Sequence, residues 1–137
     1  MGKKQFNIKV PDVPTSVSIT KNANTNDVFF SFKHLSRESY TRCRDCSFFI
    51  ELLQRFQKLS LLGWKEIRQS HRHSWGMEKM PVNQIKHDGT VSRITPDVRE
   101  LDVFRASGDN RVLVGLQEQQ VFNVFFIEAN FGDISNH

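Results

Sequence analysis

The sequence has no long hydrophobic run and none of the short strings that mark the common enzyme families. No apolar stretch approaches the roughly 18 residues of a membrane-spanning helix, so we expect no membrane partner. The opening residues, MGKKQFNIKV, lack the apolar segment of a signal peptide, and we therefore expect a cytoplasmic protein. A phosphate-binding loop, a G-x-S-x-G elbow, an H-E-x-x-H zinc motif and a paired acidic metal motif are all missing. Hence we expect no cofactor.

Cysteine is scarce as well. Cys43 and Cys46 form one C-x-x-C, CRDC, and with His71 and His73 they can complete a Cys₂His₂ zinc site. The two histidines are only two residues apart, whereas a zinc finger spaces them by roughly three to five. We therefore expect reduced cysteines at the start of a helix, with a zinc-stabilised interaction domain and a redox pair as the alternatives.

Positive charge is unevenly distributed along the 137 residues, which suffice for a single domain, 1–137, with its own core. The net charge is +4. Residues 1–32 carry four basic and two acidic side chains, residues 33–93 carry twelve and six, and residues 94–137 carry three and seven. The middle of the chain, at +6, suits either a polyanionic partner or an ordinary solvated helix face.

The order of periodic segments predicts an α+β fold, with two helices packed on one face of a mainly antiparallel sheet of four to five strands. Residues 1–26 have no helical period, so we expect an extended segment there, ahead of an α+β core at 27–137. The expected elements are a strand over 27–35, a helix that starts near residue 46, a second helix over 60–70, a loop over 71–83 leading into a strand near 82–87, and strands over 101–105, 111–116 and 121–127.

The first helix has the clearest pattern. Either Asp45 or Ser47 can cap it, and its apolar residues recur at helical spacing: Phe48, Phe49, Leu52, Leu53, Phe56 and Leu59. Arg55 and Lys58 fall largely on the other face of this helix. The second helix has Ser60 as its expected cap and Gly63 inside it.

Two arginines, Arg105 and Arg111, flank the turn ASGDN between two of the last three strands. A five-residue loop at 106–110 or a three-residue loop at 108–110 puts both on one face, where they can share an anion. A two-residue turn at 108–109 puts them on opposite faces. The sequence allows all three registers.

This hairpin, VFRASGDNRVLVGL, followed by VFNVFFIEAN and a polar tail that ends in a histidine, resembles the RelE/ParE-like toxin superfamily. Its members are small and basic, with two helices on an antiparallel sheet and an arginine on each side of a tight turn. The RNA-cleaving branch acts on mRNA in the ribosome and is blocked by an antitoxin. The resemblance therefore implies a metal-independent endoribonuclease, with RNA or the ribosome and a protein antitoxin as partners.

The resemblance implies Arg105, Arg111, Lys79 and His137 as site residues, and the basic, imidazole and aromatic residues of the middle segment add further candidates. The catalytic candidates are Arg105, Arg111, Lys79, His71, His73 and His137, and the RNA-binding candidates are Arg72, Trp75 and Lys86. Arginine can hold phosphate oxygens, and histidine can move protons near neutral pH. The family's C-terminal tyrosine has no counterpart, because Tyr40 is the only tyrosine. The alternative is a non-catalytic RNA- or protein-binding module of a small basic α+β fold; the oligomeric state stays open.

Overall fold

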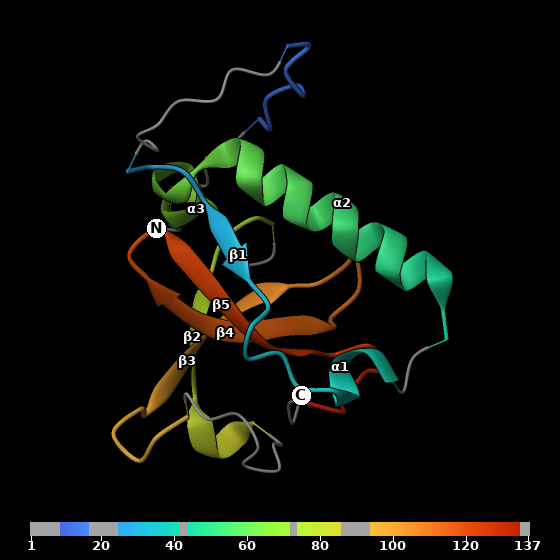
Figure 1. The fold of residues 1–137 in the computed structure, drawn as a ribbon, viewed down its shortest axis with the longest axis vertical. Helices are drawn as coiled ribbons and strands as arrows, with labels where there is room; N and C mark the ends of the chain where they lie inside the picture. The colour runs from blue at the N-terminus through green and yellow to red at the C-terminus, as the bar shows by residue number, and fades with distance from the viewer. Residues whose placement is uncertain (1–8, 17–24, 42–43, 72–73, 86–93, 135–137) are drawn as a thin grey trace, which may run out of the picture.

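The computed structural model describes residues 9–16, 25–41, 44–71, 74–85 and 94–134. Within them the chain forms the expected α+β fold, with a five-stranded sheet in the order β1-β5-β4-β3-β2 (Figure 1). The elements are β1 (Phe29–Ser31), α1 (Glu38–Thr41), α2 (Cys46–Leu62), α3 (Trp64–Gln69), β2 (Glu78–Pro81), the 3-10 turn η1 (Val82–Gln84), β3 (Glu100–Arg105), β4 (Val112–Glu118) and β5 (Val121–Ile127).

The sheet is antiparallel except at one edge. β2, β3, β4 and β5 pair antiparallel in turn, while β1 pairs parallel with β5. Two residues, Gln119 and Gln120, join β4 to β5, and Gln119 takes a positive φ of 56° as tight hairpin turns require. Parallel pairing of β1 with β5 requires a long connection between the two strands. The segment between them, which includes the helices, provides it. The prediction of a mainly antiparallel sheet is thus confirmed.

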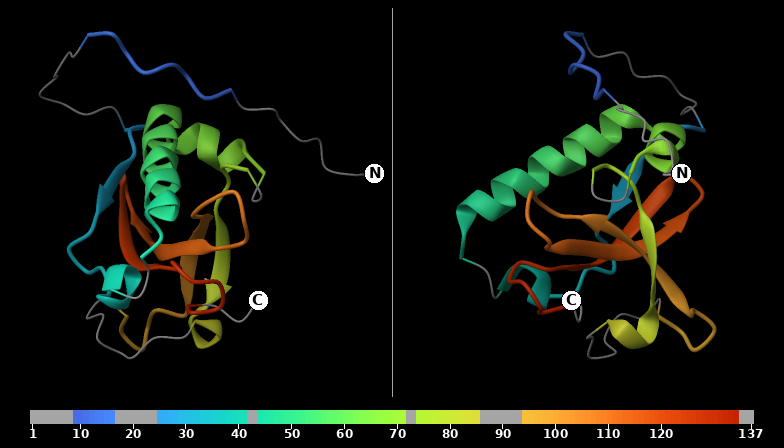
Figure 2. Two further views of the ribbon diagram at one scale, coloured as in Figure 1. Left: turned by 90° about the vertical axis from the view of Figure 1, so that its right-hand side faces the viewer. Right: turned by 180° about the vertical axis from the view of Figure 1, so that it is seen from behind.

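The long helix α2 lies across one face of the sheet (Figures 1 and 2). Asp45 is its N-cap, and the carboxylate accepts a hydrogen bond of 3.0 Å from the backbone N–H of Ser47. The expected apolar stripe is buried or half-buried with one exception. Leu53, predicted to face the core, is 71% exposed.

The predicted start of the second helix is wrong. Ser60 does not cap it, because α2 continues to Leu62 and the Ser60 hydroxyl donates 2.8 Å back to the carbonyl of Phe56. The break comes at Gly63, whose φ of 102° suits glycine. A side chain there would also meet Asn26, whose amide nitrogen lies 2.4 Å from the position of a Cβ. Helix α3 therefore starts at Trp64.

Two predicted strands also need correction. The strand expected over 27–35 is limited to Phe29–Ser31, since the backbone turns at Phe32, whose carbonyl accepts 3.1 Å from the N–H of Leu35. The strand expected near 82–87 lies earlier, at Glu78–Pro81. Proline has no N–H to continue an edge ladder, and the chain enters a 3-10 turn directly after it.

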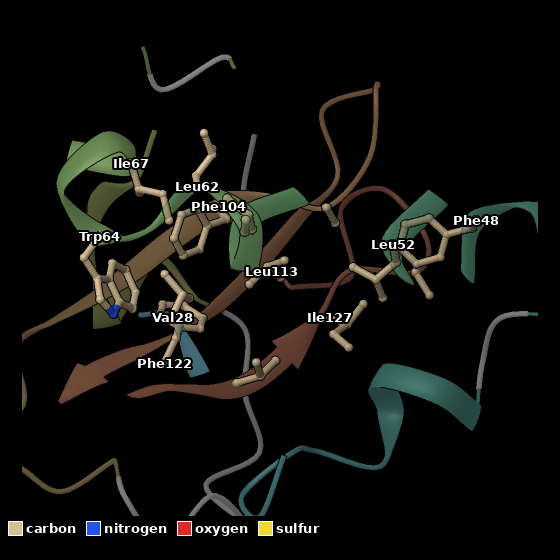
Figure 3. Close-up of a cluster of buried hydrophobic side chains, with 14 residues drawn as sticks. Val28, Phe48, Leu52, Leu62, Trp64, Ile67, Phe104, Leu113, Phe122 and Ile127 are labelled. Atoms are coloured by element: carbon tan, nitrogen blue, oxygen red, sulfur yellow. The ribbon is translucent and has the colours of Figure 1, made fainter. Parts of the chain in front are cut away.

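The core has one cluster on each face of the sheet. Figure 3 shows the cluster between the helices and the sheet, where the labelled side chains are Val28, Phe48, Leu52, Leu62, Trp64, Ile67, Phe104, Leu113, Phe122 and Ile127. The indole N–H of Trp64 donates 2.9 Å to the carbonyl of Gln120, which ties α3 to the β4–β5 turn. The other face buries a second cluster that includes Val103, Val114 and Phe125.

Candidate functional site

The β3–β4 hairpin adopts the register that separates its two arginines. Arg105 pairs with Val112, and the N–H of Ala106 donates 2.9 Å to the carbonyl of Arg111. Side chains alternate along a strand, so Arg105 shares the face of Val112 and Arg111 shares the opposite face, with Ala106. The two therefore do not form a common anion site across the hairpin.

Each arginine instead binds groups of the hairpin and its surroundings. The Nε of Arg111 lies 2.8 Å from Asp109 Oδ2, and its Nη1 donates 2.7 Å to the carbonyl of Ala129. Its guanidinium carbon also sits 4.1 Å from the centre of the Phe48 ring. Arg105 donates to the side-chain oxygen of Asn110 and, at 3.3 Å, to the carbonyl of Asp109.

Asp109 is the negative group that pairs with Arg111. Burial raises the pKa of Asp109, but hydrogen bonds from Arg111 and Ser107 more than offset this and hold the pKa below its ordinary value. Asp109 is therefore ionised at neutral pH, which favours the compact turn.

Lys79 lies on β2 opposite Asp102, away from Arg111. Its Nζ lies 2.5 Å from Oδ1 of Asp102 in an ion pair, and Oδ2 accepts 2.8 Å from the N–H of Gln117. Asp102 is four residues before Ala106, the residue opposite Arg111, a separation of roughly 13 Å along the strand. The structure therefore does not bring Lys79 and Arg111 together, and the charge of Lys79 is matched by a buried carboxylate.

Lys79→Ala is expected to lower the free energy of unfolding by about 1 to 2 kcal/mol, because Asp102 would keep its charge but lose its cationic partner. The solvent exposure of the lysine, 61%, keeps the effect below that of a fully buried pair. Urea denaturation followed by circular dichroism measures it. Lys65→Ala, an exposed position on α3, is the control, with an expected change within about 0.5 kcal/mol. An equal stability for the two variants would contradict a structural role for Lys79.

The histidine and cysteine candidates are only partly described. His71 is exposed, and its carbonyl accepts hydrogen bonds of 2.9 Å from the N–H groups of Ser74 and Gly76. Cys46 is exposed at the start of α2. The other candidates lie outside the described residues: Cys43, Arg72, His73, Lys86 and His137. Among the residues that the structure describes, no three His, Cys, Asp or Glu side chains are grouped to hold a metal ion.

A cationic hollow that the sequence did not predict lies between α2, the loop after α3 and the β3–β4 turn. It has a volume of about 230 Å³, and its lining residues are Glu51, Gln54, Arg55, Lys58, Trp75, Ser107 and Gly108. Trp75, the RNA-binding candidate that falls within the described residues, lines it. The helical pattern alone put Arg55 and Lys58 largely on the other face of α2; the tertiary structure covers that flank with the loop.

Arg55 is the centre of this cationic hollow. Its Nε donates 3.1 Å to the carbonyl of Arg105, and its Nη2 donates to the carbonyl of Ser74. The guanidinium carbon lies 4.1 Å from the centre of the Trp75 ring, and Lys58 Nζ lies 5.7 Å from the same centre. Arg55 thus joins the helix to both the hairpin and the loop.

The positive charge of Arg55 is not balanced by a carboxylate among the described residues of the hollow. Burial, and after it the positive charge of Arg105, lower the pKa of Arg55 to about 10. Its described partners are carbonyl groups and a ring. Glu51, the acid among the described lining residues, forms no ion pair with it. A half-buried cation held by neutral groups favours an anionic ligand.

No helix in the described part of the chain is both long and apolar enough to span a membrane. Comparison with protein-family models, with curated proteins and with solved structures found no match to this chain.

Proposed function

We propose that this protein binds single-stranded RNA by holding the phosphate backbone in the cationic hollow. The observation that carries the proposal is Arg55, a half-buried guanidinium beside Arg105 without a carboxylate partner. A phosphate would supply the missing negative charge, and the planar fork of an arginine matches phosphate oxygens.

Two further features support RNA as the ligand. Trp75 places an aromatic ring under the cations Arg55 and Lys58, and arginine held on an aromatic ring is a common element of single-strand binding grooves. Residues 33–93, which contribute both cations and the ring, carry most of the positive charge of the chain. Binding of this kind requires no metal and tolerates many sequences.

Binding without cleavage is favoured over catalysis by the way the catalytic candidates are engaged. Arg111 is held by Asp109 and the carbonyl of Ala129, and Lys79 is paired with Asp102. A cleavage reaction needs cations on the phosphorane and a proton acceptor within reach of the same phosphate.

The second candidate function is a cytoplasmic, ribosome-associated endoribonuclease of the RelE-like kind, neutralised by an antitoxin. Its support is the helix pair followed by antiparallel strands, as the resemblance implied. His71 adds to this support. It is exposed, and its backbone carbonyl accepts the hydrogen bonds that begin the turn carrying Trp75 to the hollow. On this alternative His71 would act beside the cationic hollow rather than beside the arginine hairpin.

One experiment tests both functions. Fluorescein-labelled single-stranded RNA is titrated with the protein, its anisotropy is recorded, and the same samples are run on a denaturing gel. We expect binding with a Kd on the order of 10 μM at physiological salt, weakening as salt rises, with the RNA intact. Fragments that appear with the wild type and not with His71→Ala would establish the endoribonuclease. Flat anisotropy with intact RNA would overturn the proposal.

A further inference from the structure

Within the described part of the chain, the strand β1 is an edge of the sheet. Among the described strands its only neighbour in the sheet is β5, and Figure 2 (left) shows β1 at the margin of the molecule, with no other described strand on its outer side. The N–H of Phe29 donates 3.1 Å to the carbonyl of Gln120, so Phe29 and Ser31 turn their backbone groups toward β5. By the alternation of parallel pairing, the N–H and C=O of Phe30 face outward.

The opposite edge of the sheet carries residue types that discourage a further strand, whereas this edge is protected only by the shortness of β1. β2 carries Lys79 and ends at Pro81, two residue types that discourage a further strand. β1 has neither and is flanked by exposed aromatic side chains, with Phe29 45% and Phe32 47% exposed. An apolar edge without lysine or proline is a site for strand addition.

Exposed apolar surface continues from this edge onto α2. The ring of Phe56 packs 4.7 Å from Phe30 and 5.5 Å from Phe32, between ring centres, which fixes the side of α2 that faces β1. Leu53 lies one turn before Phe56 and is 71% exposed, and Ile50, a further turn back, is 59% exposed. The edge and the flank of α2 together form one apolar strip.

The charges around β1 identify the occupant that fits. Asp27 lies two residues before the strand and Lys33 two residues after it, and both are exposed. Antiparallel pairing of β1 with a copy of itself, centred on Phe30, brings Asp27 of each copy to the end of the interface where Lys33 of the other copy enters the turn after β1. It also pairs the outward N–H and C=O of Phe30 with the same groups of the second copy.

We propose that this protein forms a two-fold symmetric dimer through β1, which joins the two sheets into one of ten strands. The same patch serves both copies, as a closed two-fold interface requires. The interface covers Phe29 and Phe32 and brings the two apolar strips of α2 to the same side. The proposal is independent of RNA binding, since it uses none of the residues of the cationic hollow.

Charge reversal tests the register of the dimer. Sedimentation velocity over a wide concentration range should show the wild type shifting from monomer to dimer. Asp27→Lys places like charges near Lys33 of the second copy, and Lys33→Asp does so near Asp27, so each variant alone should associate at least about tenfold more weakly. Mixed in equal amounts, the two variants should form a heterodimer, because both of its charge pairs are then opposite.

The controls separate this interface from others. Lys65 lies on α3, away from β1. Lys65→Asp makes the same change in net charge as Lys33→Asp and should leave the dimer intact. Phe29→Lys, at an exposed side chain, should abolish it, and thermal melts establish that each variant is folded. A wild type that stays monomeric at the highest concentration would overturn the proposal. The proposal would also be overturned if the dimer persisted in Asp27→Lys, in Lys33→Asp and in Phe29→Lys. The contact between the copies would then lie elsewhere.

Discussion

The double variant Arg55→Gln/Lys58→Gln is expected to bind single-stranded RNA roughly 100-fold more weakly than the wild type, since each lost cation–phosphate contact contributes about 1.4 kcal/mol. The two side chains flank the Trp75 ring, at 4.1 Å and 5.7 Å from its centre, so a phosphate in the hollow lies within reach of both. The plot of log Kd against log salt should also flatten by about 1.4, because two fewer counterions are released from a single strand. Anisotropy titrations at four salt concentrations measure both effects.

A matched pair of variants decides whether the hollow or the net charge matters. Lys65→Gln/Arg68→Gln removes the same charge from exposed positions on α3 and should cost less than about threefold in affinity. Arg55→Lys keeps the charge but loses the fork, and should lie between the wild type and the double variant. Since Arg55 also holds the carbonyls of Arg105 and Ser74, a thermal melt must accompany each titration. Equal losses in the two double variants would refute a role for the hollow.

Gly115→Ala is expected to destabilise the fold by about 4 kcal/mol or more, a large part of the total stability of a small domain. A Cβ at this position would lie 1.9 Å from the carbonyl oxygen of Asn123 and 2.9 Å from the Phe122 ring. Both obstacles belong to β5, where the pairing with β4 shifts register between Val114 and Gly115. The adjacent strands β4 and β5 would have to separate to admit one methyl group. Urea unfolding followed by circular dichroism measures the loss.

Gly108→Ala is the matched control for this substitution. Gly108 lies in the β3–β4 turn, and no atom comes within 4 Å of the position of a Cβ there. Its replacement should change the free energy of unfolding by no more than about 0.5 kcal/mol. If Gly115→Ala were equally harmless, the close approach of β4 and β5 at this point would be wrong.

The sequence by itself determined the elements whose signals are local. The helix at Cys46–Leu62 follows from an apolar repeat along one stretch of chain and from a capping Asp45 that bonds two residues ahead. The strands β3, β4 and β5 follow from short apolar runs separated by turn residues, and short turns imply antiparallel pairing. The α+β class then follows from the order of these elements. Where a local signal was ambiguous, as at Ser60 or Pro81, the predicted boundary moved by several residues.

Only the tertiary structure decided what the polar residues do, because their partners are distant in sequence. Three registers of the arginine hairpin satisfied the local pattern. In the register that formed, Arg111 lies over the ring of Phe48 and donates to the carbonyl of Ala129, both distant in sequence. The ion pair of Lys79 with Asp102 joins residues 23 positions apart across two strands. The cationic hollow combines a helix, a loop and a turn, whose meeting no periodicity encodes. Side-chain periodicity reports which face of an element is buried, whereas a site depends on which other elements arrive at its flanks.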